Sequence, residues 1–269
     1  MNKHIGILGC GWLGFPLAKS LIKKGYHVKG TTTSTGKLEK LQNEGIEPFE
    51  IRLTETGTEG NIKEFLSQVG TLIINVPPKL RGNNAESFVD KIKFLISELK
   101  DSEISNIIFV SSTAVYGDLE GEVTEATPVR PNTESGRQLV QCENMFQKEV
   151  GLDTTIVRFG GLIGPDRHPV TTLSGRKQLG NGNHAINLIH LYDCIHMIQT
   201  ILEEGYWGEI FNGVYPYHPK KQLYYFEEAQ KRGIPTPSYK ETSSKAMGKI
   251  VLSQNFLNKS HNFTTSIVS

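Results

Sequence analysis

The sequence predicts an α/β fold in which a doubly wound parallel sheet carries a small C-terminal lobe. Short apolar runs typical of buried strands alternate with amphipathic, helix-like segments over roughly the first 165 of the 269 residues. The glycine-rich stretch GCGWLG follows the first apolar run and precedes the first helical segment, as in Rossmann-type sheets. Beyond that region the alternation loosens into loop-rich sequence with scattered prolines and tyrosines.

Each element of the sheet domain is indicated by its apolar spacing and by the residues that stop it. We expect strands at residues 4–9, 27–32, 47–53, 71–78, 106–112 and 154–164. The intervening helices are expected at residues 13–25, 37–45, 61–69, 85–100 and 135–149. The first two helices stop at Gly25 and Gly45, and Pro77 and Pro78 end the fourth strand.

The C-terminal third is divided between the sheet and the lobe. The expected elements are a loop-rich segment at 170–190, a helix at 191–205, a strand at 209–214 and a helix at 221–233. We assign residues 1–165 to a dinucleotide-binding domain, to which residues 191–214 return. Residues 166–190 and 215–269 form the substrate-side lobe. Such a lobe caps the carboxyl edge of the sheet, where ligands of doubly wound sheets bind.

Composition and charge exclude several classes of protein. The formal net charge is +1, and no block of like charges suggests a nucleic-acid or anionic-membrane partner. No apolar run approaches the ~20 residues of a spanning helix, and a strand begins almost at once, which leaves no room for a signal peptide. Cys10, Cys142 and Cys194 are too scattered for a disulfide framework or a metal site. We therefore expect a cytoplasmic protein without a metal.

The motif GCGWLG matches the spacing G-x-G-x-x-G of a phosphate-binding turn. Gly9 permits the tight turn, Gly11 lets the backbone approach a pyrophosphate, and Gly14 allows close packing of helix on strand. Trp12 and Leu13 lead into the helix, whose free N–H groups and partial positive charge favour phosphates. The motif predicts a bound dinucleotide; the alternative is a glycine-rich turn without a ligand.

The end of the second strand favours NADP over NAD. The stretch GTTTSTGK at 30–37 has no Asp or Glu, although an acid about 20 residues after the glycines would bind the ribose 2′-hydroxyl of NAD. Thr32 stands where that acid is expected. Thr33, Ser34 and Lys37 are suited to hydrogen-bond and neutralise a 2′-phosphate. The alternative is an ordinary solvated turn.

Residues at the ends of two further strands are also expected beside the cofactor. Asn75, Val76 and Pro77 end the fourth strand, and Ser111 lies near the end of the fifth. The carboxyl ends of parallel strands meet at one edge of a sheet, where the dinucleotide would lie. Simple strand termination explains the first three residues equally well.

Four ordered motifs resemble those of a known family. They are GCGWLG at 9–14, SSTAVYG at 111–117, RFGGLIGP at 158–165 and LIHLYDC at 188–194. Together they resemble the extended short-chain dehydrogenases/reductases of the NAD-dependent epimerase/dehydratase type, and segment 173–190 resembles their atypical YeeZ-like branch. The resemblance implies a Rossmann domain with a small substrate lobe. It also implies a nicotinamide cofactor across the first, fourth and fifth strands and a small polar or nucleotide-sugar-like substrate.

The family's catalytic set is incomplete in this chain. The resemblance implies a Ser or Thr after the fifth strand, matched by Ser112, and a Tyr-x-x-x-Lys pair on the next helix. Ser135 falls at the tyrosine and Leu139 at the lysine. A phenol of pKa near ~10, lowered by an adjacent ammonium group, can exchange a proton with substrate. A serine hydroxyl is a far weaker acid, and leucine carries no charge, so the family's standard mechanism is missing.

Other side chains are weighed as replacements for the missing acid or base. Arg137 can stabilise an oxyanion but stays protonated. Tyr116 is a phenol near the cofactor, although its place in VYG favours packing of the loop. His168 and His190 lie in the substrate half and titrate near neutral pH, with ordinary polar contacts as the simpler interpretation.

Substrate contacts are expected from polar residues of the lobe and the fifth helix. Arg137, Arg176, Asn187 and His190 are the candidates, and Lys177 lies beside the second of them. The resemblance places a nucleotide-sugar diphosphate near the glycine-rich loop of residues 173–183, and a solvated loop is the alternative. Arg158 on the sixth strand is interpreted as a buried partner of an Asp or Glu, or as a substrate contact.

Two functions remain open from the sequence. One is an NADP-dependent oxidoreductase or epimerase in which Ser112 polarises a carbonyl or hydroxyl group. The other is a catalytically degenerate cofactor-binding protein that senses redox state or scaffolds a partner. The apolar stripe from Phe88 to Leu99 is consistent with a homodimer, in which it pairs with helix 135–149 of a second subunit, and equally with a core that faces the sheet.

Overall fold

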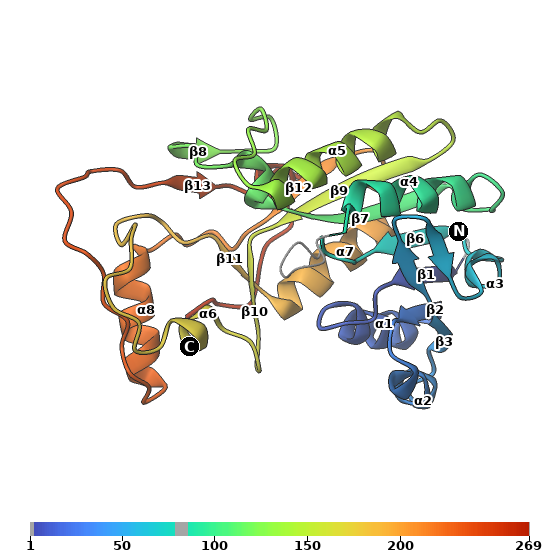
Figure 1. The fold of residues 1–269 in the computed structure, drawn as a ribbon, viewed down its shortest axis with the longest axis horizontal. Helices are drawn as coiled ribbons and strands as arrows, with labels where there is room; N and C mark the ends of the chain where they lie inside the picture. The colour runs from blue at the N-terminus through green and yellow to red at the C-terminus, as the bar shows by residue number, and fades with distance from the viewer. Residues whose placement is uncertain (1–2, 79–85, 269) are drawn as a thin grey trace.

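The computed structural model describes residues 3–78 and 86–268, and within these residues the centre is a seven-stranded parallel sheet (Figure 1). Its strand order is β12-β9-β7-β6-β1-β2-β3. The strands are β1 (His4–Leu8), β2 (His27–Thr32), β3 (Glu47–Glu50), β6 (Thr71–Ile74), β7 (Asn106–Ser112), β9 (Asp153–Phe159) and β12 (Ile210–Gly213). Every neighbouring pair is parallel. The doubly wound α/β fold expected from the sequence is confirmed.

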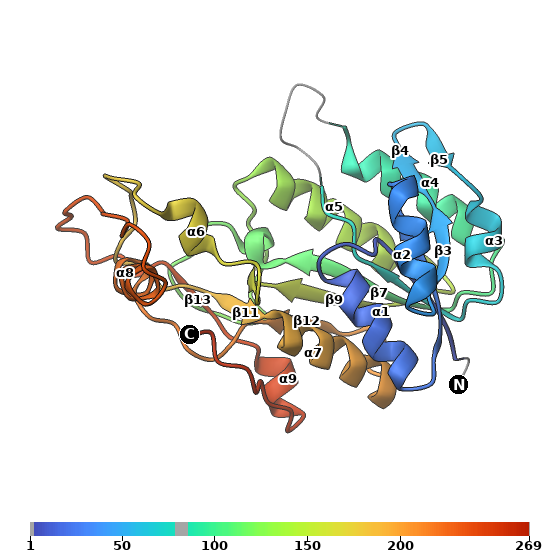
Figure 2. The ribbon, with the colours of Figure 1, turned by 90° about the horizontal axis from the view of Figure 1, so that it is seen from below.

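Helices cover both faces of this sheet (Figure 2). One face carries α1 (Gly14–Lys23), α2 (Leu38–Asn43) and α7 (Leu191–Glu204). The other carries α3 (Ile62–Leu66), α4 (Phe88–Leu99) and α5 (Glu134–Lys148). Successive side chains of a strand point to opposite faces, so Ile7 joins the first cluster and Leu8 the second. Because both faces are covered, the central strands β1 and β6 are apolar along most of their length.

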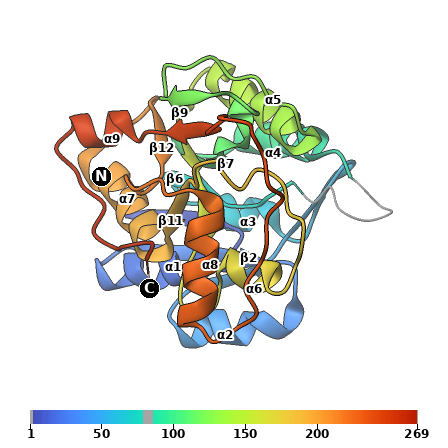
Figure 3. The ribbon, with the colours of Figure 1, turned by 90° about the vertical axis from the view of Figure 1, so that its left-hand side faces the viewer.

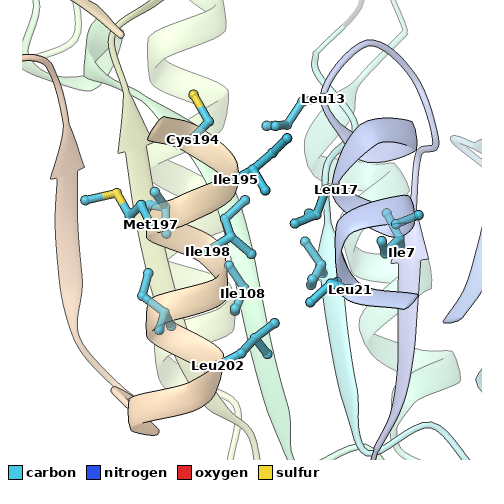
Figure 4. Close-up of a cluster of buried hydrophobic side chains, with 14 of the residues drawn as sticks. Ile7, Leu13, Leu17, Leu21, Ile108, Cys194, Ile195, Met197, Ile198 and Leu202 are labelled. Atoms are coloured by element: carbon cyan, nitrogen blue, oxygen red, sulfur yellow. The ribbon is translucent and has the colours of Figure 1, made fainter. Parts of the chain in front are cut away.

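The core between α1 and α7 shows how the helical spacing is used (Figure 4). Leu17 and Leu21 of α1 face Ile195 and Ile198 of α7, above Ile108 of the sheet. Residues three and four apart share one face of a helix, which explains these pairs. Leu17, Leu21, Ile108 and Ile198 are completely buried. Complete burial of each such side chain contributes about 1.5–3 kcal/mol relative to exposure.

The apolar stripe of α4 packs inside this chain. Phe88, Ile92, Leu95, Ile96 and Leu99 are all buried in the cluster that α4 shares with the sheet and α5. The interpretation as sheet-facing core is therefore correct for this stripe. A homodimer stays a prediction that would need other residues.

The C-terminal lobe, which faces the viewer in Figure 3, has a small apolar core of its own. Its elements are β10 (Gly161–Ile163), α6 (Pro169–Leu173), β11 (Leu188–His190) and α8 (Lys221–Lys231). The chain then returns to the main domain, where β13 (Lys249–Val251) pairs with β8 (Gly121–Val123) and α9 (Gln254–Asn258) packs near β12. Phe256 of α9 is buried in the same cluster as α1 and α7. The division of the chain into two domains remains a prediction.

Several boundaries differ from those expected. The third strand stops at Glu50, and β4 (Arg52–Thr54) forms a hairpin with β5 (Gly57–Glu59). The expected strand 154–164 is interrupted at Gly160, and α4 begins only at Phe88 because Ser87 caps it by accepting the N–H of Asp90. The three-residue strands and α9 are too short to show periodicity. In residues 3–78 and 86–268 no helix combines the length and apolar character needed to cross a membrane.

Candidate functional site

The glycine loop joins β1 to α1 with the geometry of a phosphate-binding turn. Gly9 has a φ of +106°, a conformation that side chains with a Cβ rarely adopt. A Cβ on Gly14 would lie 2.1 Å from the carbonyl oxygen of Gly9, so helix and strand approach too closely for any other residue. A Cβ on Gly11 would meet nothing within 4 Å, which leaves that side of the loop open to a ligand.

The loop presents unused hydrogen-bond donors at the start of α1. Within the described part of the chain, no hydrogen bond uses the N–H groups of Gly11, Trp12 or Leu13. These are the orphan donors of a helix N-terminus, where the helix dipole adds partial positive charge. The donors and the open face fit a pyrophosphate. The Trp12 indole donates to the carboxylate of Asp166 at 2.8 Å, which ties the loop to the segment that enters the lobe.

A hollow of about 290 Å³ lies beside the loop at the carboxyl edge of the sheet. Eight of the residues predicted to bind the cofactor line it: Gly9, Gly11, Thr32, Thr33, Lys37, Asn75, Val76 and Pro77. Other lining residues, among them Arg52, Phe88 and Lys91, were not predicted to contact the cofactor. The ends of β1, β2 and β6 thus converge as expected, and the hollow suits an adenosine group.

The end of β2 combines one anchored threonine with exposed polar side chains. The Thr31 hydroxyl accepts the N–H of Gly9 at 2.9 Å, which fixes β2 against the glycine loop. The Thr32 hydroxyl accepts the N–H of Ser34 at 3.2 Å and is nearly buried. Thr33 and Lys37 are exposed at the mouth of the hollow. Lys37 also borders a second hollow, between α1 and α2, that shares Gly11 with the first.

Arg52 is the functional candidate that sequence reasoning missed. It follows the third strand, and no spacing relative to the glycine motif marks it. Pairing of β2 with β3 sets Thr32 opposite Glu50, and the N–H of Ile51 bonds the Thr32 carbonyl at 3.0 Å. Arg52 therefore begins β4 beside the end of β2. The expected strand at 47–53 placed Arg52 inside the strand, so the sequence offered no signal for its position at the hollow.

Ser111 and Ser112, at the end of β7, make different hydrogen bonds. The Ser112 hydroxyl accepts the N–H of Ala114 at 3.2 Å and so caps the 3-10 helix η2 (Thr113–Tyr116). Its own proton stays available for donation. Ser111 is buried and donates to the carboxylate of Glu143 at 2.6 Å. The structure therefore draws Ser111 into the protein interior, and its proposed contact with the cofactor stays a prediction.

Ser111 belongs to a buried network around Arg158. The guanidinium of Arg158 pairs with Glu143 at 2.6 Å, with both side chains at most 5% exposed. The interpretation of Arg158 as a buried partner of an acid is confirmed. Arg158 also donates to the Tyr116 hydroxyl at 2.9 Å, and that hydroxyl donates to Asn212 at 2.8 Å. Burial raises the pKa of Tyr116 although Arg158 opposes it, and the side chain is completely buried, so Tyr116 is no candidate acid.

The positions of the missing catalytic pair lie on the first turns of α5. Thr133 caps this helix by accepting the N–H of Gly136, and Ser135 is half-buried. Leu139 is 3% exposed and packs in the apolar cluster between α5 and the sheet. An ammonium group in that cluster would lose its hydration without a partner. Leucine here is therefore a packing residue.

The two candidate histidines differ in what their rings can donate. Burial lowers the pKa of His168 to about 4, and both its ring nitrogens are engaged, by the N–H of Val170 and the hydroxyl of Tyr224. Burial also lowers the pKa of His190, whose Nδ1 accepts the N–H of Tyr192 at 3.2 Å. That contact places the proton of neutral His190 on Nε2. Only His190 keeps a ring N–H without a partner in the described residues.

None of the predicted substrate residues lines either of the two hollows described above. Both ends of the Asn187 amide bind β13: its Nδ2 donates to Lys249, and its Oδ1 accepts from Val251 at 2.8 Å. Arg137 pairs with Glu134 on the exposed side of α5. Arg176 is exposed on the loop after α6. Their roles in substrate binding stay predictions. Across residues 3–78 and 86–268, no cluster of His, Cys, Asp and Glu has the arrangement of a metal site.

Comparisons with known proteins identify the family. Residues 5–212 match the model of the NAD dependent epimerase/dehydratase family. The chain is 34% identical over 250 residues to Protein YeeZ of Escherichia coli K12, covering 93% of this chain and 91% of that protein.

Solved structures share the fold at lower identity. UDP-glucuronic acid 4-epimerase from Bacillus cereus in complex with NAD has a TM-score of 0.81 at 18% identity, covering 98% of this chain and 92% of that one. MoeE5 in complex with UDP-glucose and NAD has a TM-score of 0.78 at 16% identity, covering 98% and 94%. The resemblance drawn from the four motifs is confirmed, and the chain belongs to the NAD-dependent epimerase/dehydratase family of short-chain dehydrogenases/reductases.

Proposed function

We propose that this protein binds NADP and catalyses an oxidoreductase- or epimerase-type reaction on a small polar, nucleotide-sugar-like substrate. The observation that carries the proposal is the glycine loop with its unused N–H groups, next to the hollow at the ends of β1, β2 and β6. A glycine-rich turn without a ligand would have no reason to keep both features. The missing Tyr-x-x-x-Lys pair makes the active site a non-standard one.

The glycine loop and the hollow would bind different parts of the cofactor. The N–H groups of Gly11, Trp12 and Leu13 would hold the pyrophosphate, and the hollow would hold the adenosine. Thr33 and Lys37 support NADP, because a hydroxyl and an ammonium group suit a phosphate and no carboxylate occupies residues 30–37. The bound nicotinamide would supply or accept the hydride.

The proposed substrate class is supported by what the structural neighbours hold. One is described as a UDP-glucuronic acid 4-epimerase and another as a complex with UDP-glucose. Arg137, Arg176, Asn187 and His190 remain the residues from which substrate contacts are expected. The first two are exposed and charged, so they suit a phosphate or carboxylate group.

Ser112 and His190 are the groups best placed for proton chemistry. The Ser112 hydroxyl keeps its proton for a substrate oxygen, because the N–H of Ala114 uses only its acceptor side. Ser135 would supply a second hydroxyl from α5. Neither serine is acidic enough to act as the acid alone. The free Nε2 proton of His190 makes it our candidate for the group that the lobe contributes.

A second function is favoured by one specific observation. Leu139, at the position expected for the family's lysine, is buried among apolar side chains and packs in the core. A chain that binds NADP without turnover would sense redox state or scaffold a partner. Cofactor binding is common to both functions, whereas turnover belongs to the first.

Two measurements test these functions in order. Fluorescence titration with NADPH and NADH should show binding of both, with NADPH the tighter; failure to bind either would refute both functions. A panel of sugar nucleotides and carbonyl compounds, followed by NADPH absorbance and product analysis, then separates them. Turnover that falls in Ser112→Ala but persists in Ser97→Ala, an exposed serine on α4, supports the enzyme. If no compound of the panel is turned over although NADPH binds, the second function, a cofactor-binding sensor or scaffold, is supported.

A further inference from the structure

Two basic side chains follow the ends of the neighbouring strands β2 and β3. Lys37 ends the 3-10 helix η1 (Thr35–Lys37), just before α2. Arg52 begins β4, which follows the neighbouring strand β3. Both line the hollow proposed for the adenosine, together with Thr32 and Thr33. A group attached to the ribose at the end of β2 would therefore lie in a hollow that both cations line.

Neither cation is neutralised by a strong partner. In residues 3–78 and 86–268, the Arg52 guanidinium makes one ion pair, to Glu59 at 3.5 Å, and no hydrogen bond. Both partners are at least 60% exposed, so water and salt screen this contact. The Lys37 side chain has no ion pair or hydrogen bond among the same residues. One exposed cation without a charged partner and one with only a weak partner, both at a hollow, indicate an anionic ligand.

The rest of the lining does not cancel this charge. Among the described residues, the other charged side chains that line the hollow are Lys91 and Glu86, and these two form an ion pair with each other. The remaining described lining residues are apolar or uncharged. The excess positive charge of this lining therefore comes from Lys37 and Arg52.

We propose that Arg52 is a specificity-determining residue that, with Lys37, binds the 2′-phosphate of NADP. The planar guanidinium fork matches the oxygens of a phosphate, and its weak tie to Glu59 costs little to replace. Thr33 supplies a hydroxyl to the same hollow. Arg52 takes over the selection that a carboxylate at the end of β2 makes in NAD-binding sheets. This inference rests on the proposed binding of NADP.

The test separates the phosphate from the rest of the cofactor. Calorimetry on the apo protein compares adenosine 2′,5′-bisphosphate with adenosine 5′-monophosphate, and NADPH with NADH. The variants are Arg52→Met and Lys37→Met. Lys23→Met is the control, because this exposed lysine ends α1 at the far end from the glycine loop and its loss changes net charge equally. Thermal unfolding of each apo variant confirms that it is folded.

We expect Arg52→Met to lower the affinity for the two 2′-phosphorylated ligands about tenfold, which corresponds to the loss of one charge-assisted contact. The affinity for adenosine 5′-monophosphate and NADH should fall by no more than about twofold. Arg52→Lys should fall between, and Lys23→Met should match the wild type. Equal weakening of all four ligands would show that Arg52 contacts the adenine instead, which overturns the inference. So would tight NADPH binding unaffected by Arg52→Met. A wild-type protein that binds no dinucleotide would refute the proposed function itself.

Discussion

Substitution of Glu143 by glutamine should be among the most destabilising single changes in this fold. Glu143 accepts from Arg158 Nη2 at 2.6 Å, from Arg158 Nε at 3.1 Å and from the Ser111 hydroxyl at 2.6 Å. Arg158 is 4% and Glu143 2% exposed, so water cannot replace the lost charge. Glutamine keeps the volume but leaves the guanidinium charge buried and unpaired.

The expected magnitude follows from that burial. Breaking a buried ion pair by removing one partner costs about 3–5 kcal/mol. For a chain of this size such a loss lowers the melting temperature by roughly 10 °C. The assay is urea unfolding of Glu143→Gln beside wild type, followed by circular dichroism.

The control is Glu134→Gln, which removes the exposed partner of Arg137 on the same helix. Exposed pairs contribute little, so this variant should unfold close to wild type. If Glu143→Gln cost no more than the control, the assignment of the buried network as a main stabilising feature would be wrong.

The other predictions concern the glycine loop, the lysine position and a buried histidine. Gly14→Ala forces a Cβ to within 2.1 Å of the Gly9 carbonyl and should cost about 1–3 kcal/mol in urea unfolding. A Cβ on Gly11 would enter open space, so Gly11→Ala should leave the stability unchanged and lower the affinity for NADPH in titration. Equal losses of stability in Gly14→Ala and Gly11→Ala would refute this distinction between a packing glycine and a ligand-facing one. Leu139→Lys should cost about 2–4 kcal/mol in the same assay and restore no turnover; near-neutral stability would contradict its role in packing. The neutral ring of His168, with a pKa of about 4 against an ordinary 6.5, contributes stability above pH 6.5 that is lost as the pH falls towards 4. That loss amounts to about 3 kcal/mol, and a steeper fall from pH 7 to 4 in wild type than in His168→Gln would verify it.

The parts of the site that could be predicted are those that local sequence controls. Gly9, Gly11 and Gly14 lie within one turn between a strand and a helix, so their spacing alone sets the loop geometry. The same holds for the end of β2, where Thr33 and Lys37 follow their strand directly. The gap at Ser135 and Leu139 was visible because the motif counts residues along one helix.

The parts that could not be predicted depend on contacts between distant segments. Arg52 reaches the adenosine hollow through the register of β2 against β3 and the break in the strand after Glu50. Asn187 was interpreted as a substrate contact from its place in a loop. In the structure its amide holds β13, a segment more than sixty residues later that returns across the sheet domain.

The succession of the α/β elements along the chain and the phosphate-binding turn follow from the amino-acid sequence, which also puts Ser135 and Leu139 where the family's Tyr-x-x-x-Lys pair is expected. Hydrophobic periodicity and glycine spacing involve only a few consecutive residues, so they can be recognised in the sequence without the structure. Tertiary structure alone decided that Tyr116 and Ser111 contact a buried ion pair, that the stripe of α4 packs in this chain's own core, and that Arg52 lines the same hollow as Lys37. Those outcomes depend on register, burial and the returning C-terminal segment, which bring together residues that no local pattern relates.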